Sequence, residues 1–368
     1  MQIALTKKLA DALSVKTPHS QESENPLFSW TANWTKVWEN HRTEDLIVLV
    51  NHATRFTVAL YQVKRKDLKN LESLVKKAIE HTLLVMNINP EIVAEYMRRA
   101  GEFEWVQNHN RQTASWVTKA GLECCSHISR NYDGIEKMFS DTVGEYNNYL
   151  FVNFSAPNSA AEFVPYQAMI HALSELTGKP AYRYRAFELR VTLDLDIYKA
   201  VRRIIVPASL SFERLHKVLQ EVFGWEDYHL YEFAIHTGDP NKPVARIVPD
   251  KESLEYDDKA VLMDGQTLAA FLPKYSQILY TYDMGDGWEH TIELVQVLED
   301  YDQESPYLVE ASGQAPPEDV GGVNGFIDFQ AIMQDPGHPE YPAMKAWAGY
   351  WSVDLNDYAK RPRVIHPF

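Results

Sequence analysis

The sequence predicts an α+β protein of two domains, residues 1–178 and 183–368, the second a β-grasp-like antiparallel sheet with packed helices. The first observation is length, since 368 residues suit two domains of about 100–200 residues each. The second is a change of period, because apolar residues recur every three or four positions up to residue 176 and alternate strictly from residue 187. The third is the break between these patterns, where Gly178 ends a helix and Pro180 prevents it from resuming.

The first domain is expected to pack helices on a small antiparallel sheet. Two apolar runs, LIVLV and FTVALY, are joined by NHATR and predict a hairpin over residues 46–61. A stripe of aliphatic residues predicts an amphipathic helix from about Asp67 to Met86. Asn89 and Pro90 suit the N-cap and first position of another helix, which Gly101 ends. The other expected elements are a helix at 7–13, a loop at 14–26, a strand at 102–106 and a helix at 111–127.

The second domain begins with two strands, 186–196 and 201–207, which form a hairpin. Ser211 is a good N-cap for the helix that follows, and Gly224 is placed to end it. The apolar stripe of this helix predicts that it packs across the hairpin. Further strands are expected at about 229–236, 277–282 and 290–298, and this order of elements is typical of a β-grasp-like module.

Charge is unevenly distributed along the chain. The formal net charge is −15, of which residues 1–180 carry −1 and the remainder carries −14. An acidic second domain is repelled by phosphate backbones. Only the first domain could therefore bind nucleic acid, through the basic residues of 64–77 and through Arg111.

The cysteines point to a reducing compartment. Cys124 and Cys125 are the only two, and neighbours in sequence cannot staple distant segments. This excludes a disulfide framework and a cysteine-based zinc site. The N-terminus lacks the apolar stretch of a signal peptide, and the aliphatic run at 46–50 is far shorter than the ~20 residues that span a bilayer. We therefore expect a cytoplasmic protein that does not enter a membrane.

Three separated segments of the second domain, in order, resemble a known family. They are RRIIVPASLSFERLHKVLQEVFGWEDYHLYEF at 202–233, YDMGDGWEHTIEL at 282–294 and PPEDVGGVNGF at 316–326. Residues 183–358 are similar in these motifs to the plasmid pRiA4b ORF-3-like family. The resemblance implies a bacterial or archaeal protein of unsettled function, with some relatives carried by plasmids or insertion sequences and some labelled resolvases. Where relatives often have cysteines beside the acidic motif, this chain has Ala315 and Val320, so any role of that thiol pair is absent.

The first domain resembles a small bacterial domain of unknown function. The stretches that carry this resemblance are TKKL at 6–9, NPLFSW at 25–30, NHATRF at 51–56 and NHNRQ at 108–112. It implies no activity. The nucleotide-binding and hydrolase motifs GxxxxGK[ST], GxGxxG, HExxH and GxSxG do not occur. An HxxR box at His127 to Arg130 fits a tyrosine recombinase by letters alone, and chance accounts for it.

The strongest chemical signal is the loop from Tyr282 to His290, which holds three carboxylates and an imidazole. Two further acidic segments, 317–322 and 335–340, could converge on it. Carboxylate oxygens suit hard divalent cations, and histidine can complete a transition-metal site. The alternative interpretation is turn chemistry, in which the aspartates cap turns and need no ligand. The candidate metal ligands are Asp283, Asp286 and Asp319, and a divalent cation is the candidate cofactor, although the sequence leaves the cofactor unknown.

The strand period limits how many of these groups can meet. Adjacent residues of a strand point to opposite faces, so Glu289 and His290 cannot both face one cleft. We expect two or three ligands rather than six. The full candidate cleft comprises Asp283, Asp286, Trp288, Glu289, His290, Glu318, Asp319 and His338, together with His229 and Tyr231, which are expected to share one face of a strand.

A second candidate is an anion site in the first domain. His109, Asn110 and Arg111 lie at an expected strand-to-helix junction, where backbone N–H groups favour anions. Arg55, from the hairpin loop, could join them. The alternative interpretation is an ordinary solvated surface.

These observations favour a cytoplasmic binding or accessory protein associated with plasmids or other mobile elements, for which a protein partner is plausible. The enzyme alternative is a metal-dependent hydrolase or nuclease that uses the acidic loops. The sequence leaves open which of the two applies.

Overall fold

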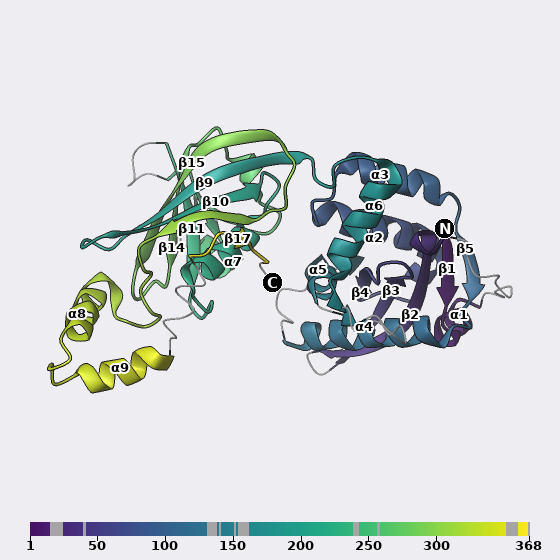
Figure 1. The fold of residues 1–368 in the computed structure, drawn as a ribbon, viewed down its shortest axis with the longest axis horizontal. Coiled ribbons are helices and arrows are strands. Elements are labelled where there is room, and N and C mark those ends of the chain that lie inside the picture. The colour runs from purple at the N-terminus through teal and green to yellow at the C-terminus, as the bar shows by residue number, and fades with distance from the viewer. Residues whose placement is uncertain are drawn as a thin grey trace. The chain divides into compact units, whose positions relative to one another are not determined.

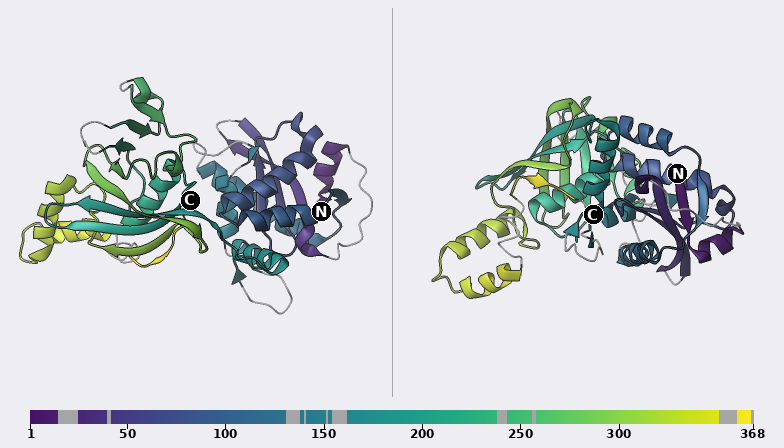
Figure 2. Two further views of the ribbon diagram at one scale, coloured as in Figure 1. Left: turned by 90° about the horizontal axis from the view of Figure 1, so that it is seen from above. Right: turned by 45° about the vertical axis from the view of Figure 1, so that its right-hand side comes forward.

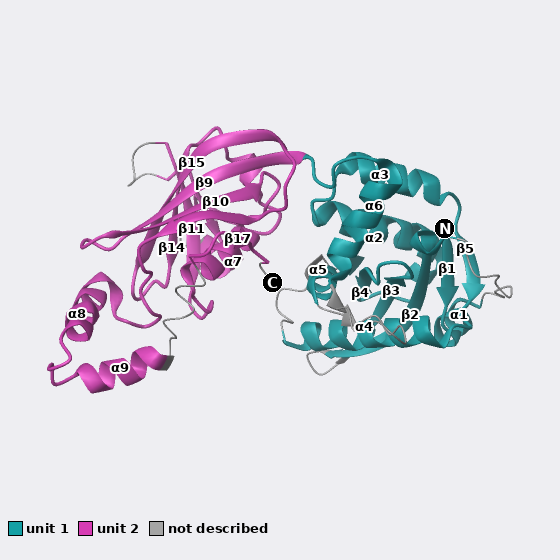
Figure 3. Ribbon diagram, viewed as in Figure 1, with its two compact units in different colours: residues 1–183, 368 teal, residues 184–367 magenta. Residues whose placement is uncertain are grey.

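The structure is a computed structural model that describes residues 1–14, 25–39, 42–130, 138–139, 141–150, 152–153, 162–237, 243–255, 258–350 and 360–366. The chain divides into two compact units, Met1–Arg183 and Tyr184–Pro367 (Figure 3). Each unit combines helices with a mixed sheet, so the predicted α+β class with two domains is confirmed. Within the described ranges, no helix combines the length and the apolar character needed to cross a bilayer.

The first unit is built on a sheet whose described strands run in the order β5-β1-β2-β3-β4-β6 (Figure 1). The predicted hairpin is confirmed, because β3 and β4 pair antiparallel across the NHATR turn. The prediction of an antiparallel sheet is wrong for β1, which runs parallel to both β2 and β5. The pattern of the sequence does not predict β2. The strands of this unit are β1 (Gln2–Leu5), β2 (Ser29–Glu39), β3 (Arg42–Asn51), β4 (Thr57–Tyr61), β5 (Glu104–Gln107) and β6 (Met138–Phe139), with β7 (Val152–Asn153) and β8 (Glu162–Phe163) as a separate pair.

Helices cover both faces of this sheet, and β3 shows the consequence. Ile47 and Leu49 face one apolar core, formed with α2, α3 and α6, whereas Leu46 and Val48 face a second core, formed with α4. The ribbon views of Figure 2 show helices on both sides of these strands. A strand that is covered on both sides has no polar face, which explains the uninterrupted run LIVLV. The helices are α1 (Lys7–Leu13), α2 (Leu71–Val85), α3 (Pro90–Ala100), α4 (Arg111–Arg130), α5 (Asp141–Tyr149) and α6 (Pro165–Thr177).

The second unit has a larger sheet, whose described strands run in the order β13-β12-β11-β14-β15-β9-β10-β16-β17 (Figure 1). The β9–β10 hairpin is confirmed, and every pairing in the sheet is antiparallel except that of β12 with β13. The strands are β9 (Tyr184–Asp194), β10 (Lys199–Pro207), β11 (Tyr231–His236), β12 (Ala245–Val248), β13 (Ala260–Leu262), β14 (Gln277–Tyr282), β15 (Trp288–Tyr301), β16 (Tyr307–Ser312) and β17 (Arg363–Val364).

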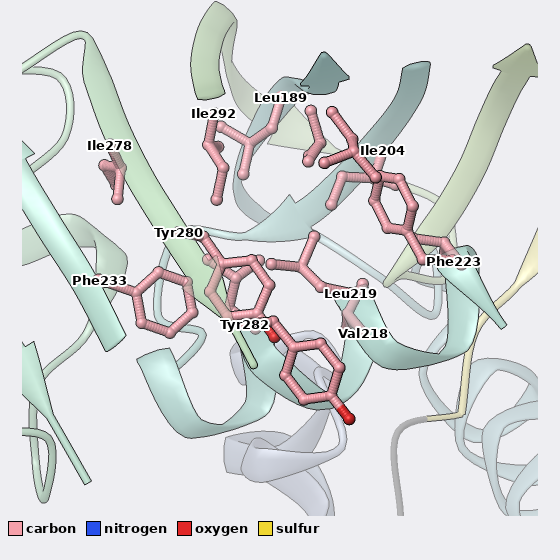
Figure 4. Close-up of a cluster of buried hydrophobic side chains, with 14 of the residues drawn as sticks. Leu189, Ile204, Val218, Leu219, Phe223, Phe233, Ile278, Tyr280, Tyr282 and Ile292 are labelled. Atoms are coloured by element: carbon pink, nitrogen blue, oxygen red, sulfur yellow. The ribbon is translucent and has the colours of Figure 1, made fainter. Parts of the chain in front are cut away.

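Helix α7 (Phe212–Phe223) packs on this sheet as predicted. It begins after Ser211, whose side chain accepts a hydrogen bond from the Arg214 N–H at 3.2 Å, and it ends at Gly224, which is left-handed with φ 79°. Figure 4 shows Val218 and Leu219 pointing into the apolar core of the sheet. Fully burying a side chain of this kind stabilises the fold by about 1.5–3 kcal/mol. Two further helices, α8 (Gly322–Gln334) and α9 (Tyr341–Tyr350), follow β16.

Each unit has an apolar core of its own, so we expect each to fold alone. A fragment of residues 182–368 should show a single cooperative transition in urea, followed by circular dichroism, and so should a fragment of residues 1–181. An uncooperative transition, or strong binding of a hydrophobic dye by either fragment, would show that the boundary is misplaced.

Candidate functional site

The turn between β14 and β15 is shaped by Asp283. This residue has a left-handed backbone with φ 55°, and its side-chain Oδ1 accepts hydrogen bonds from the N–H groups of Gly285 at 2.9 Å and Asp286 at 3.2 Å. Its backbone carbonyl accepts a further bond from Gly287. These bonds are the turn chemistry that the sequence suggests, and they occupy only one carboxylate oxygen. The other oxygen, Oδ2, remains for a second role.

The acidic loop before α8 meets this turn. The backbone N–H of Gly321 donates to Asp286 Oδ2 at 3.1 Å, so the Asp286 carboxylate joins the two loops. Gly322 has φ 68°, and a Cβ atom added there would lie 2.8 Å from the backbone oxygen of Asp286. Only glycine allows the two backbones to approach this closely. The convergence of these two acidic segments, which the sequence leaves open, is therefore present in the structure.

His229 brings a third loop to the same place, from between α7 and β11. Its Nε2 lies 3.1 Å from Asp319 Oδ1 and 3.7 Å from Asp283 Oδ2. One ligand atom from each of these three side chains lies within 4.8 Å of the other two. Two ligands that each bind a metal at about 2.0–2.2 Å are at most ~4.4 Å apart, so both distances from His229 Nε2 fit a shared ion. We call His229, Asp283 and Asp319 the metal cluster.

Glu318 is a buried carboxylate at the floor of the metal cluster. Its side chain is 1% exposed, and its Oε1 accepts hydrogen bonds from the Glu226 N–H at 2.9 Å and the Tyr282 hydroxyl at 3.0 Å. Its Oε2 has no hydrogen-bond partner among the described residues and lies 3.9 Å from His229 Nε2. Burial raises the pKa of Glu318. A buried oxygen without a partner, directed at the metal cluster, is an observation that turn chemistry does not explain.

His229 Nε2 is also without a well-aligned partner. The nearest carboxylate oxygen is at hydrogen-bond distance, yet the described residues provide no hydrogen bond of acceptable geometry to this nitrogen. Three carboxylates from two loops thus surround one imidazole nitrogen. A cation between them would relieve the repulsion among the acidic groups and would satisfy the nitrogen.

The loop that carries His229 is anchored by a buried hydrogen-bond network. His216 of α7 is fully buried, with Nδ1 2.8 Å from the Tyr280 hydroxyl and Nε2 2.6 Å from Asp227 Oδ1. Gln220 accepts a hydrogen bond from the Asp227 N–H at 2.9 Å and donates to the Tyr280 hydroxyl at 3.1 Å. Burial lowers the pKa of His216, an effect that the nearby Asp227 opposes. Asp227 is thereby fixed two residues before His229.

Tyr282 connects this loop to the acidic loops. Its hydroxyl accepts a hydrogen bond from the Tyr228 N–H at 3.1 Å while it donates to Glu318. The indole N–H of Trp225 donates to the backbone oxygen of Pro316 at 2.9 Å. The Trp225 bond joins the 225–230 segment to 316–318 directly, and the two bonds of the Tyr282 hydroxyl join them through the end of β14. Neither Asp227 nor Tyr282 is predicted from the sequence as a functional residue, because their roles depend on contacts across the sheet.

Three of the sequence candidates on β15 lie away from the metal cluster. His290 is fully buried, with its ring against Phe223 and Trp225. Its Nδ1 lies 3.1 Å from the Trp288 backbone oxygen and 3.3 Å from that of Tyr280, which places the ring proton on this nitrogen. Burial lowers the pKa of His290 to about 3. Trp288 is also buried in the core, whereas Glu289 is exposed, so Glu289 and His290 do face opposite sides of the strand.

Tyr231 and His338 also serve local structure. β11 begins at Tyr231, so the predicted strand at 229–236 starts two residues too early. His229 consequently belongs to the preceding loop, while the Tyr231 ring stacks on His216 with centroids 3.4 Å apart. His338 lies between α8 and α9, where its Nδ1 accepts a hydrogen bond from the Glu340 N–H at 3.2 Å. The imidazole that meets the acidic loops is therefore that of His229 rather than that of His290 or His338.

The anion-site candidates of the first unit gather around Trp116 and the start of α4. The guanidinium of Arg55 lies 5.1 Å from the centroid of the Trp116 ring. Burial lowers the pKa of Arg55. The Asn110 side chain accepts a hydrogen bond from the Gln112 N–H at 2.8 Å and so caps the helix, while Arg111 is exposed. His109, Asn110 and Trp116 line one cavity.

Each of the two units matches a known family of proteins. Residues 185–360 match the family model described as plasmid pRiA4b ORF-3-like protein, and residues 2–159 match that of a domain of unknown function (DUF6933). Both matches fall where the motifs place the two resemblances. An uncharacterized protein of Sinorhizobium fredii, y4hQ, is 36% identical over 170 residues, which cover 45% of this chain and 82% of that protein. The crystal structure of a protein of unknown function from Methanosarcina mazei Go1 is 30% identical with a TM-score of 0.39, over 44% of this chain and 89% of that one.

The close approach of the two acidic loops can be tested at Gly322, with Gly287 as a matched control. Both glycines are left-handed, with φ 68° and 71°, but a Cβ atom at Gly287 would meet nothing within 4 Å. Alanine at either position carries the strain of a left-handed residue, roughly 1–2 kcal/mol. Gly322→Ala should cost a further ~1–3 kcal/mol in the free energy of unfolding, because its Cβ atom must displace the Asp286 backbone. If urea unfolding shows the same loss of unfolding free energy in Gly322→Ala and Gly287→Ala, the two acidic loops are not in contact.

The neutral, buried His290 predicts a dependence of stability on pH. Its pKa is about 3 in the folded chain, below the ~6.5 of an exposed histidine, so the unfolded chain binds more protons between these values. Stability should therefore fall as the pH decreases from 6.5 towards 3. His290→Gln should make this fall shallower. The slope of the unfolding free energy against pH should decrease by up to the amount that the uptake of one proton produces. Ile278→Val, a core substitution that leaves the rings around His290 in place and removes no titrating group, should keep the wild-type slope. An unchanged slope in His290→Gln would contradict the assignment.

Proposed function

The chain belongs to the plasmid pRiA4b ORF-3-like family through its second unit, and from this premise we propose that this unit is a binding module for a divalent transition-metal ion. The observation that carries the proposal is the convergence of His229, Asp283 and Asp319, from three separate loops, within 4.8 Å of one another. The matched relatives are described as uncharacterized, so the proposal depends on the geometry of this chain.

The chemistry of the metal cluster favours one group of ions. Imidazole nitrogen is a ligand for Zn²⁺, Mn²⁺ and similar metals, while an oxygen-only set would suit Mg²⁺ or Ca²⁺. One nitrogen and two carboxylates, with Glu318 behind them, form a mixed set. Three protein ligands also leave coordination positions for water or for a bound molecule. We therefore favour Zn²⁺ or Mn²⁺ as the cofactor.

The remaining parts of the proposal concern the role and place of the protein. We infer a binding or accessory role in the cytoplasm, which is supported by two unbridged adjacent cysteines. The family takes its name from a plasmid reading frame, and this supports an association with plasmids or other mobile elements. Nucleic acid, if bound, would be bound by the first unit, because the acidic excess lies in the second.

A metal-dependent hydrolase or nuclease is the second candidate, and Glu318 favours it. Hydrolysis on a metal requires a base beside the metal-bound water. Glu318 Oε2 is buried, lacks a hydrogen-bond partner among the described residues and faces the metal cluster. Activity of the metal-loaded chain on a simple phosphodiester, lost in Glu318→Gln while metal is still bound, would favour the enzyme over the accessory protein.

Metal binding is tested by titration calorimetry on the whole chain. Zn²⁺ and Mn²⁺ should bind with a stoichiometry of one and more tightly than Mg²⁺ or Ca²⁺, and should raise the melting temperature. The double variant Asp283→Asn, Asp319→Asn should bind at least about tenfold more weakly, because it removes both anionic ligands. The asparagine at position 283 can still accept the turn hydrogen bonds through its side-chain oxygen, so the turn itself is kept.

Glu289→Gln is the matched control for that titration. It removes an exposed carboxylate from the strand beside the cluster, and it should bind metal as the wild type does. His229→Gln should weaken Zn²⁺ binding more than Ca²⁺ binding, since only the former depends on imidazole. If the wild type gives no heat with any of these ions at millimolar concentration, the metal proposal fails and the loops are turns alone.

A further inference from the structure

Exposed apolar side chains lie next to the metal cluster in the sequence. Of the ten large apolar side chains that are exposed in the described part of the chain, three are those of Tyr228, Leu230 and Met284. Tyr228 and Leu230 are the two neighbours of His229, and Met284 directly follows Asp283. The three side chains are 65%, 66% and 50% exposed. Single apolar residues scattered over a surface need no explanation, but three beside one candidate site indicate a contact surface for a ligand.

Backbone hydrogen bonds hold the two segments that carry these apolar residues together. The Asp283 N–H donates to the backbone oxygen of Leu230 at 2.9 Å, which continues the pairing of β11 with β14 by one residue pair. The Tyr228 N–H donates to the hydroxyl of Tyr282, the last residue of β14, at 3.1 Å. The three apolar residues are therefore fixed at the same end of the β11–β14 pair as the metal cluster.

The metal cluster is closed on one side and open to solvent on the other. Glu318 and Asp283 form the inner side, because their side chains are only 1% and 9% exposed. Asp319 and His229 form the outer side, with side chains that are 58% and 28% exposed. Three protein ligands leave coordination positions free on a bound ion, and these would lie on the outer side. A molecule from solvent can therefore reach the ion.

The charge of the second unit disfavours a polyanionic ligand at this site. The carboxylates of Asp283 and Asp319 already balance the two positive charges of a divalent ion. The sequence neighbours of the three cluster residues are apolar or acidic, and residues 181–368 carry a formal net charge of −14. A nucleic-acid backbone needs lysine or arginine beside its phosphates, which these neighbours do not supply. A ligand with one oxygen group for the metal and an apolar remainder matches the surface better.

We propose that the metal-loaded cluster binds small molecules in which an oxygen-donor group, such as a carboxylate, is attached to an aromatic or branched aliphatic group. The oxygen group occupies the open coordination positions of the ion, and the apolar group packs against Tyr228, Leu230 and Met284. A tyrosine ring offers a flat apolar surface, and the flexible methionine side chain adapts to the shape of its partner. This inference rests on the proposed metal site and names the class of ligand that the site takes.

The test uses the full chain loaded with Zn²⁺ and two hydroxamates, which offer the same two oxygens to a metal. Acetohydroxamate carries a methyl group, whereas benzohydroxamate carries a phenyl group. In calorimetry, benzohydroxamate should bind at least about tenfold more tightly, because the phenyl ring buries more apolar surface. With Co²⁺ in place of Zn²⁺, the visible absorption bands of the ion should change when either hydroxamate is added, which shows that the probe binds to the metal.

The double variant Leu230→Ser, Met284→Gln removes two apolar side chains and keeps the metal ligands and the backbone bond to Asp283. It should bind Zn²⁺ as tightly as the wild type does, while its preference for benzohydroxamate should fall to about twofold or less. Val244→Ser is the matched control. Val244 is 43% exposed and its N–H donates to the backbone oxygen of Ile235, at the opposite end of β11 from Leu230, so this variant should keep the wild-type preference.

The failure of this inference can be told apart from the failure of the metal site. If Zn²⁺ does not bind to the wild type, both fail. If Zn²⁺ binds but the two hydroxamates bind equally, the double variant keeps the preference, or the Co²⁺ bands do not change, the metal site stands and the inference about its ligand is overturned. Sedimentation of the Zn²⁺-loaded chain tests another occupant. A dimer that the double variant abolishes would show that a second copy covers the apolar residues, and this would also overturn the proposal.

Discussion

The arrangement of the second unit's loops depends on one buried chain of hydrogen bonds, from the Tyr280 hydroxyl through His216 to Asp227. It links the sheet, α7 and the loop after α7. A polar chain inside an apolar core is favourable only when each member has its partners, and Gln220 completes this one from the same helix. Asp227 is left-handed with φ 60°, a conformation that needs such support. The Tyr228 N–H bond to Tyr282 and the packing of buried Trp225 hold the other side of the same loop, so His229 is positioned from both sides.

The positions of the acidic residues are likewise fixed by hydrogen bonds between segments that are distant in sequence. Asp283 and Asp319 are also left-handed, and the two loops that carry them are joined through Asp286 and the close approach of Gly322. Hydrogen bonds within the loops use one oxygen of Asp283 and one of Glu318, which leaves the remaining oxygens directed at His229. Turn formation and the proposed metal binding would therefore use different oxygens of the same carboxylates, so the two interpretations that the sequence permits are compatible with each other.

The local sequence pattern predicts the helices and strands of this chain well. It predicts poorly which of these segments contact one another in the fold. The alternation after residue 187, the caps of α7 at Ser211 and Gly224, and the NHATR hairpin are all properties of short segments, and the structure has them. β2 escapes prediction because its sequence, SWTANWTKVWE, mixes apolar and polar residues, and its strand character comes from pairing with β1 and β3. β1 is parallel to β2 and β5, and the four residues of β1 carry no information about which strands flank it.

The predictions for the candidate site succeed and fail for the same reason. Strand period correctly separates Glu289 from His290, but it cannot say which of the two faces is the core, and the core contains the histidine. The choice of His229 over His290 and His338 depends on the exact start of β11, and an uncertainty of two residues there moves the side chain from a strand face into a loop.

The three members of the metal cluster are separated by long stretches of chain, with the whole of β11–β14 between His229 and Asp283 and with β15 and β16 between Asp283 and Asp319. An ion held by all three would close two large loops at once, and closure of large loops removes conformational freedom from the unfolded chain. The nascent chain could present all three ligands only after Asp319, three residues before α8, had been synthesised. In the cell, capture of the ion would thus follow the synthesis of all but the last part of the second unit, and the ion would act as a non-covalent staple in a chain whose only cysteines are too close together to provide one.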